Sequence, residues 1–299
     1  MEFRREGVWP KDVSAAAEDY AYCRQIMQAA SRNYSFAGSF LPRSKRQHVE
    51  ALYALLRVGD DLVDVDHGEF ESPEAAIDYW QRTYDRAFQV GTSPDPVMRA
   101  YLDTARTFEI PQEIMESYFR AMRQDLTVSR YQSFDGLLDY VAGSALPVGR
   151  AMTYILGVRP PYTLQEALPA ADALSIAMQL SNFLRDIPED WERGRVYLPQ
   201  DELALFGVTE GDLAAGRATP AFKRMMSFQI ERTESYYAHA RQGVGMLSEG
   251  QWAVQSGLLI YRAIIVNLKR TGYDPFLRRA SASTFGKMGL VAKSWLQTR

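Results

Sequence analysis

The sequence lacks most of the features that mark secreted, metal–sulfur or nucleic-acid-binding proteins. Its 299 residues include one cysteine, Cys23, which excludes an intrachain disulfide and a cysteine-based metal site, so we expect a reducing, cytoplasmic location. The three histidines, His48, His67 and His239, show no ligand spacing. With 34 basic and 37 acidic residues, the formal net charge is −3, which provides no basic excess for a nucleic-acid partner.

Long apolar runs and phosphate-binding glycine loops are also missing. The stretch SGLLIYRAIIVNL is interrupted by Tyr261 and Arg262 and is too short to span a bilayer. The first residues, MEFRREGVWP, are charged and have no apolar core, so we expect no signal peptide. No glycine-rich nucleotide motif, alternation of strands or solenoid repeat is found.

The chain instead shows helical periodicity over most of its length. This pattern predicts one all-α domain over residues 1–299, larger than a four-helix bundle. The breaks are expected at 91–96, 157–163 and 194–199. The predicted helices cover 13–31, 43–65, 72–90, 95–108, 111–123, 133–157, 164–191, 199–205, 220–245, 250–270 and 283–297.

Two of these helices carry aspartate in an unusual pattern. On the helical wheel of residues 49–65, the polar side chains fall in a sector about 100° wide, and apolar side chains fill most of the rest. Residues 172–190 repeat the pattern, so both helices should be mostly buried. The polar lines contain Tyr53, Arg57, Asp60, Asp61 and Asp64 on the first helix, and Ser175, Gln179, Asn182, Asp186 and Asp190 on the second.

The simpler interpretation is two amphipathic helices whose polar faces lie in water. Aspartates four residues apart repel each other, however, by roughly 0.2–0.5 kcal/mol on an open helix and by more when desolvated. A divalent cation would offset this repulsion, and oxygen-only ligands favour Mg²⁺, which also takes water and phosphate oxygens. We therefore predict two facing aspartate pairs that hold a diphosphate through metals, with Arg57, Arg185, Arg193 and Arg195 on the remaining phosphate oxygens.

Five ordered segments resemble the squalene and phytoene synthases, the isoprenoid synthases that join two prenyl diphosphates head to head. The most specific is QLSNFLRDIPEDWERGRVYLPQDEL at 179–203, and YALLRVGDDLVD at 53–64 is similar to the family's first aspartate motif. The other three are SRNYSFAGSFLP (31–42), YVAGSALPVGRAM (140–152) and YRAIIVNLKRTGYDPFLRRASASTFGKM (261–288).

The resemblance implies an all-α isoprenoid synthase fold with a central cavity. It also implies a reaction dependent on Mg²⁺, or on Mn²⁺ in its place, in which two geranylgeranyl diphosphates give a cyclopropyl diphosphate and then phytoene, for carotenoid biosynthesis. By the same resemblance, the metal ligands are Asp60, Asp64, Asp186 and Asp190; the catalytic residues are Tyr53, Tyr140, Tyr197 and Tyr261; the diphosphate-binding residues are Ser31, Arg57, Gln179, Asn182, Arg185, Arg195 and Arg278; and the cavity-lining residues are Tyr34, Gly38, Ala145, Val148 and Gly149.

Departures from the family pattern leave the product open. The run SALPVG, in which Pro147 should kink the helix, resembles relatives that make hydroxysqualene. Arg185 and the C-terminal RRASASTFGKMGL are closer to the phytoene branch. The alternative is a C30 synthase making squalene, dehydrosqualene or hydroxysqualene from farnesyl diphosphate. A further alternative is an inactive family member that acts as an assembly partner, against which the intact aspartate pairs argue.

Two more expectations concern geometry and location. Pro188 should bend its helix and re-aim Asp190. A water-insoluble product predicts peripheral docking at the inner membrane face through Lys287, Lys293 and Trp295. We expect a monomer or a homodimer.

Overall fold

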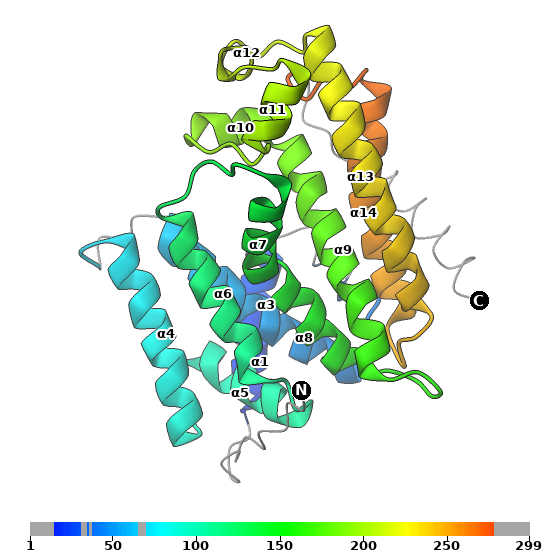
Figure 1. The fold of residues 1–299 in the computed structure, drawn as a ribbon. Helices are drawn as coiled ribbons and strands as arrows, with labels where there is room; N and C mark the ends of the chain where they lie inside the picture. The colour runs from blue at the N-terminus through cyan, green and yellow to red at the C-terminus, as the bar shows by residue number, and fades with distance from the viewer. Residues whose placement is uncertain (1–14, 31–34, 36–37, 65–69, 278–299) are drawn as a thin grey trace. The chain divides into compact units, whose positions relative to one another are not determined.

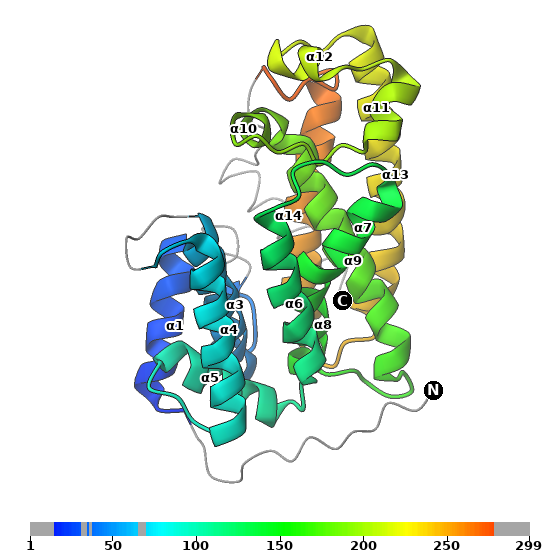
Figure 2. The same ribbon diagram turned by 60° about the vertical axis from the view of Figure 1, so that its left-hand side comes forward.

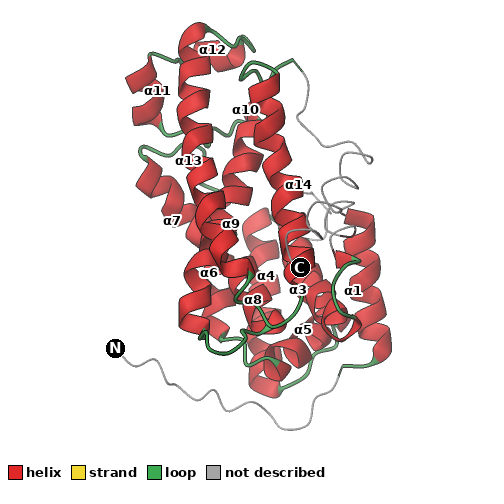
Figure 3. Cartoon of the chain, turned by 90° about the vertical axis from the view of Figure 1, so that its right-hand side faces the viewer, coloured by secondary structure: helices red, strands yellow, loops and turns green. Residues whose placement is uncertain are grey.

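The computed structural model describes residues 15–30, 35, 38–64 and 70–277 of the chain. Over these residues the regular structure is helical, with two isolated β-bridges and no strand (Figures 1 and 3). The all-α fold expected from the periodicity is confirmed. None of the helices in these ranges is both long and apolar enough to cross a bilayer.

The chain divides into two compact units, residues 1–126 with 154–156, and residues 127–153 with 157–299. One domain over the whole length therefore stays a prediction. In the first unit, α3 packs against each of the other four helices that the described residues form, and Figure 2 shows α1, α4 and α5 beside it. The helices of this unit are α1 (Ala17–Ala30), α3 (Arg43–Asp64), α4 (Pro73–Val90), α5 (Pro96–Thr107) and α6 (Gln112–Asp125).

The second unit is built around α9, α13 and α14, which pack side by side (Figures 1 and 3). A Cβ on Gly243 of α13 would lie 2.3 Å from the Cβ of Ala170 on α9, so this close approach requires glycine. The helices that begin in the described part of this unit are α7 (Phe134–Ser144), α8 (Leu146–Leu156), α9 (Leu164–Arg185), α10 (Ile187–Glu192), α11 (Gln200–Phe206), α12 (Glu210–Ala214), α13 (Pro220–Val244) and α14 (Gln251–Arg270).

Helix starts in both units follow from local capping chemistry. The Ser72 hydroxyl accepts from the backbone N–H of Ala75 at the start of α4, and Pro73 occupies the first turn. Thr163 and Glu166 form a reciprocal capping box at the start of α9. Such signals explain why these predicted starts lie within one residue of the observed ones.

Two long helices predicted from the sequence were wrong, because each is two helices in the structure. The predicted helix 133–157 is broken at Ala145, and Pro147 lies in the first turn of α8, where its missing N–H removes no helical hydrogen bond. The predicted helix 164–191 ends at Arg185, and α10 follows after Asp186. The short helix α12 was missed altogether, and the helix expected at 283–297 lies outside the described residues.

Candidate functional site

The first acidic line lies on α3, and this helix is mostly buried as its wheel predicts. No residue from 45 to 63 is exposed, and Leu52, Leu55 and Leu56 are in the core. Asp60 and Asp61 are half-buried. Asp64 ends the helix, but its side chain lies outside what the structure describes.

Tyr118 of α6 holds the α3 backbone beside Asp60. Its hydroxyl lies 2.7 Å from the carbonyl oxygen of Leu56 and 3.2 Å from Oδ1 of Asp60. A Cβ on Gly59 would lie 2.2 Å from this hydroxyl, so glycine is required for the approach. The indole N–H of Trp80 donates to the carbonyl oxygen of Leu55 at 3.1 Å on the preceding turn. Asp60 thus projects from a turn that two neighbouring helices fix.

Arg57 pairs with Asp61 one turn further along α3. Its Nε donates to Oδ2 of Asp61 at 3.0 Å, and Nη2 bonds the other carboxylate oxygen. The Arg57 side chain is 39% exposed. The structure therefore places the predicted phosphate ligand on the acidic line and gives it a carboxylate partner.

The second acidic line lies at the junction of α9 and α10. Asp186 is the residue between the two helices, and the backbone N–H of Asp190 donates to its carbonyl oxygen at 2.8 Å. The two aspartates therefore remain one helical turn apart despite the break. Nε of Arg185 donates to Oδ1 of Asp186 at 2.7 Å, and its Nη2 donates to Oδ2. Pro188 lies in the first turn of α10, as the helix break requires.

The electrostatics at Asp190 favour a bound cation. Burial, followed by the negative charge of Asp186, raises the pKa of Asp190 to about 7, and Arg193 and Arg195 oppose this shift. A cation would stabilise the ionised form of this crowded carboxyl pair. In the described ranges, no three acidic, histidine or cysteine side chains converge on one point. The carboxylate oxygens of Asp186 and Asp190 are of the type that Mg²⁺ takes, with water and phosphate oxygens filling the rest of its shell.

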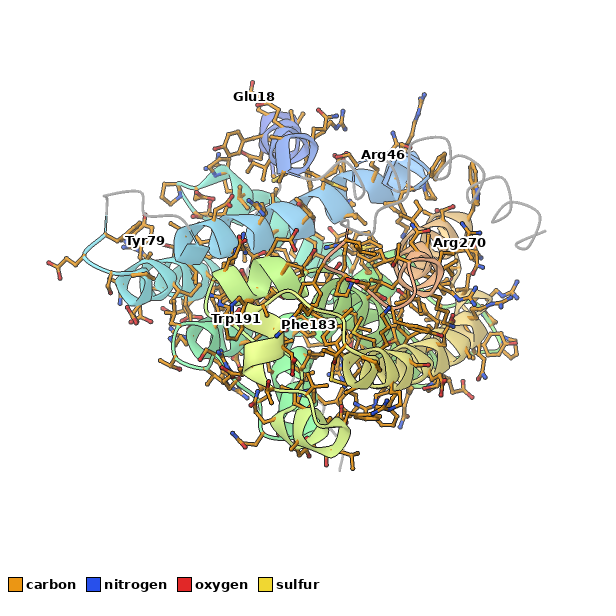
Figure 4. The ribbon with its side chains drawn as sticks, turned by 90° about the horizontal axis from the view of Figure 1, so that it is seen from above. Glu18, Arg46, Tyr79, Phe183, Trp191 and Arg270 are labelled. Atoms are coloured by element: carbon orange, nitrogen blue, oxygen red, sulfur yellow. The ribbon has the colours of Figure 1, made fainter. Side chains whose placement is uncertain are left out.

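An aromatic stack stands next to this acidic junction in the second unit. The rings of Phe183 and Tyr197 are parallel within 11° at 4.1 Å, and Tyr140 lies 5.9 Å from Tyr197. Tyr131 closes the group at 5.4 Å from Tyr140 and 6.0 Å from Tyr197. The structure thus brings together two of the four predicted tyrosines. Figure 4 labels Phe183 on α9 and Trp191 on α10.

The remaining predicted residues are spread over both units. Tyr53 is half-buried on α3, and Tyr261 is buried on α14. Gln179 and Asn182 are half-buried on α9 in the turns before Asp186. Arg195 is half-buried in the segment after α10. The α7–α8 break and the first turn of α8 contain Ala145, Val148 and Gly149. In the first unit, Gly38 lies near Met27. Ser31, Tyr34, Arg278, Lys287, Lys293 and Trp295 lie outside the described residues.

Sequence reasoning missed four side chains at these sites: Tyr118, Tyr131, Phe183 and Arg150. Arg150 of α8 forms a bidentate pair with Asp172 of α9 at 2.8 Å for each contact. The carboxylate of Asp172 lies one turn before Ser175 and so signals a partner, but nothing in the sequence indicates which arginine supplies it. Tyr131 lies in a loop without periodicity, so no pattern marks it.

Comparisons with known proteins agree with the motif resemblance. The family model for squalene/phytoene synthase matches residues 27–285. The chain is 33% identical over 297 residues to a phytoene synthase of Arthrospira platensis, covering 95% of this chain and 94% of that protein. It is also 33% identical over 289 residues to a 15-cis-phytoene synthase of Synechococcus elongatus, covering 92% of each.

Solved structures show the same fold. A squalene synthase, HpnC, from Alicyclobacillus acidocaldarius is 31% identical with a TM-score of 0.78, covering 86% of this chain and 95% of that chain. A dehydrosqualene synthase is 27% identical with a TM-score of 0.85, covering 94% of this chain and 98% of that chain.

Proposed function

Because the chain belongs to the squalene/phytoene synthase family, we propose that it joins two molecules of geranylgeranyl diphosphate head to head to form phytoene, as a step of carotenoid biosynthesis. The observation that carries this proposal is the match to proteins named phytoene synthase, at 33% identity over more than nine tenths of this chain. The two predicted acidic lines, which lie on α3 and at the α9–α10 junction, support the proposal.

The metal requirement is proposed from the donor set of each unit. Prenyl diphosphate synthases generally depend on a divalent metal ion. We assign Asp60 and Asp64 as its ligands in the first unit, and Asp186 and Asp190 in the second. When bound, Mg²⁺ neutralises the charge of the departing diphosphate. The chain contributes carboxylates that adjacent groups orient, Tyr118 for Asp60 and the α9–α10 junction for Asp190.

The other residues act on the substrate itself. Arg57, Arg185, Arg195 and Arg278, together with Ser31, Gln179 and Asn182, are assigned to the diphosphate oxygens. Tyr140 and Tyr197 are assigned to carbocation stabilisation, and their contacts with Phe183, three residues before Asp186 on α9, support this assignment. Tyr53 and Tyr261 are assigned to the same task or to proton transfer. Tyr34, Gly38, Ala145, Val148 and Gly149 are assigned to the wall around the prenyl chains.

A C30 product is the second candidate, and the solved structures favour it. The two structural relatives described above are named squalene synthase and dehydrosqualene synthase. An assay with equal concentrations of geranylgeranyl and farnesyl diphosphate, followed by extraction and chromatography, decides between them. Mainly C40 hydrocarbon supports the first proposal, whereas mainly C30 product assigns the alternative.

Cytoplasmic placement is proposed from the single cysteine, Cys23, and peripheral contact with the inner membrane face is proposed because a C40 hydrocarbon is insoluble in water. The named basic and aromatic residues near the C-terminus, Lys287, Lys293 and Trp295, are the proposed contact. Flotation of the full chain with anionic liposomes tests this proposal, and recovery of all protein in the bottom fraction would count against it.

A further inference from the structure

Arg130 ties the segment after α10 to the start of α12. Its Nη1 donates to the carbonyl oxygen of Gly194 at 2.6 Å. Its Nε and Nη2 donate to the two carboxylate oxygens of Glu210 at 2.5 and 3.2 Å. The guanidinium carbon also lies 5.8 Å from the ring centroid of Trp191. One side chain therefore contacts α10, the turn that follows it and α12.

The segment that Arg130 holds cannot keep its position by itself. Helix α10 has six residues, which is too short to be stable without tertiary contacts. Gly194 follows it with φ 74°, in the left-handed region that favours glycine. The chain then turns back, and the backbone N–H of Arg195 donates to the carbonyl oxygen of Asp190 at 2.8 Å. The turn whose Gly194 carbonyl oxygen accepts from Arg130 is therefore the turn that hydrogen-bonds to the backbone of Asp190.

The backbone beside Arg130 reinforces the same junction. The N–H of Val196 donates to the carbonyl oxygen of Ser129 at 2.9 Å, and Arg130 pairs with Val196 in an isolated parallel bridge. Glu210 neutralises the guanidinium charge through a bidentate pair, which is the strong geometry for this kind of bond. Arg130 therefore acts by fixing geometry, and it adds no unpaired positive charge next to the acidic junction.

We propose that Arg130, oriented by Glu210, is a positioning residue for metal binding, which fixes the Gly194–Arg195 turn and so holds Asp190 in its ligating place. This inference rests on the proposed function, in which Asp190 is a metal ligand. Partners that orient metal ligands typically change metal affinity by about tenfold to a hundredfold when they are removed. Arg130 should therefore control the metal requirement more than the rate at saturating metal.

The test compares Arg130→Met, Arg130→Lys and Glu210→Gln with wild type in the full-length chain. Arg123→Met is the matched control, because Nε and Nη2 of Arg123 both donate to Oδ1 of Asp78, an arginine–carboxylate pair in the other unit. Free Mn²⁺ is measured by electron paramagnetic resonance during titration with MnCl₂ in the presence of inorganic diphosphate. The Mg²⁺ concentration for half-maximal product formation is measured in parallel, and circular dichroism checks folding.

Arg130→Met should weaken Mn²⁺ binding about tenfold and raise the Mg²⁺ requirement by a similar factor, with most of the rate restored at saturating Mg²⁺. Arg130→Lys and Glu210→Gln should give smaller shifts in the same direction, and Arg123→Met none. Unchanged Mn²⁺ binding in folded Arg130→Met overturns the inference. If that variant does not fold, Glu210→Gln decides by the same criterion.

One further variant separates this inference from the proposed function. Asp190→Asn should itself weaken Mn²⁺ binding. If it does so while Arg130→Met and Glu210→Gln do not, only the positioning role fails. If Asp190→Asn leaves Mn²⁺ binding unchanged, the metal assignment of Asp190 fails, and the positioning role fails with it.

Discussion

The hydroxyl of Tyr118 serves two acceptors on α3, the carbonyl oxygen of Leu56 at 2.7 Å and Oδ1 of Asp60 at 3.2 Å. Burial, and then the negative charge of Asp60, raises the pKa of Tyr118 well above its ordinary value. The hydroxyl therefore keeps its proton and donates it. This contact connects the core of the first unit to a proposed metal ligand.

Tyr118→Phe should lower the free energy of unfolding by about 1–2 kcal/mol, because a buried carbonyl loses its side-chain donor. It should also raise the Mg²⁺ requirement, because Asp60 loses an orienting partner. Urea titration and Mg²⁺ titration of activity measure the two effects. Tyr84→Phe is the matched control, since no described group accepts from or donates to the buried Tyr84 hydroxyl. Equal losses in both variants would contradict a special role for Tyr118.

His48 in the core of the first unit lies among polar side chains. Its Nδ1 lies 2.9 Å from Oγ1 of Thr104 and 3.2 Å from the hydroxyl oxygen of Tyr20. The Tyr20 hydroxyl also donates to Asp103 at 2.6 Å. Burial lowers the pKa of His48 below its usual 6.5, and Lys45 adds to the shift while Asp103 opposes it.

This shift predicts how stability depends on pH. The contribution of His48 to the free energy of unfolding is fully present above pH 6.5, because the ring is neutral there in both the folded and the unfolded chain. As the pH falls below that value, the unfolded chain takes up a proton first, so the free energy of unfolding decreases until the lower folded pKa has been passed. Urea midpoints at about pH 7.5 and pH 5.5 measure the loss. His48→Gln should reduce the difference between them, whereas His239→Gln, at an exposed position, should not.

Gly149→Ala should destabilise the second unit. The new Cβ would lie 2.2 Å from Oγ of Ser175 and 2.9 Å from the carbonyl oxygen of Ala171, and the latter is backbone that cannot rotate away. Overpacking of this kind costs about 1–3 kcal/mol. Thermal unfolding measures it. Gly257→Ala is the control, since a Cβ there meets nothing within 4 Å. This control should be neutral or stabilising. A comparable loss of thermal stability in both variants would refute the packing explanation.

The burial of the two acidic helices could be predicted from the sequence because it depends on local periodicity. No residue from 45 to 63 or from 170 to 191 is exposed, as the inverse amphipathic wheels require. The pairing of Arg57 with Asp61 could also be predicted from the sequence, since residues four apart on a helix are neighbours. These features need no knowledge of how distant segments pack.

The breaks and the aromatic stack depend on contacts that periodicity does not encode. Apolar spacing continues through Ala145 and through Asp186, so the pattern predicts uninterrupted helices, whereas the two prolines that follow mark new first turns. Tyr131 and Tyr197 are 66 positions apart and meet because strand-like backbone bonds join their loops, such as that from the Gln200 N–H to the Tyr131 carbonyl oxygen. Only the folded structure shows that these two rings stack.

Product analysis of the purified chain with geranylgeranyl diphosphate and Mg²⁺ tests the central claim most directly. Wild type and Asp78→Asn, which alters the ion pair of Asp78 with Arg123, should form a C40 hydrocarbon with the mass and spectrum of phytoene. Asp60→Asn, Asp186→Asn and addition of a chelator should reduce that product by at least about a hundredfold, because the variants lose a proposed metal ligand and the chelator removes the metal that neutralises the departing diphosphate. Absence of C40 hydrocarbon from wild type, or undiminished product from the two aspartate variants, would contradict the account.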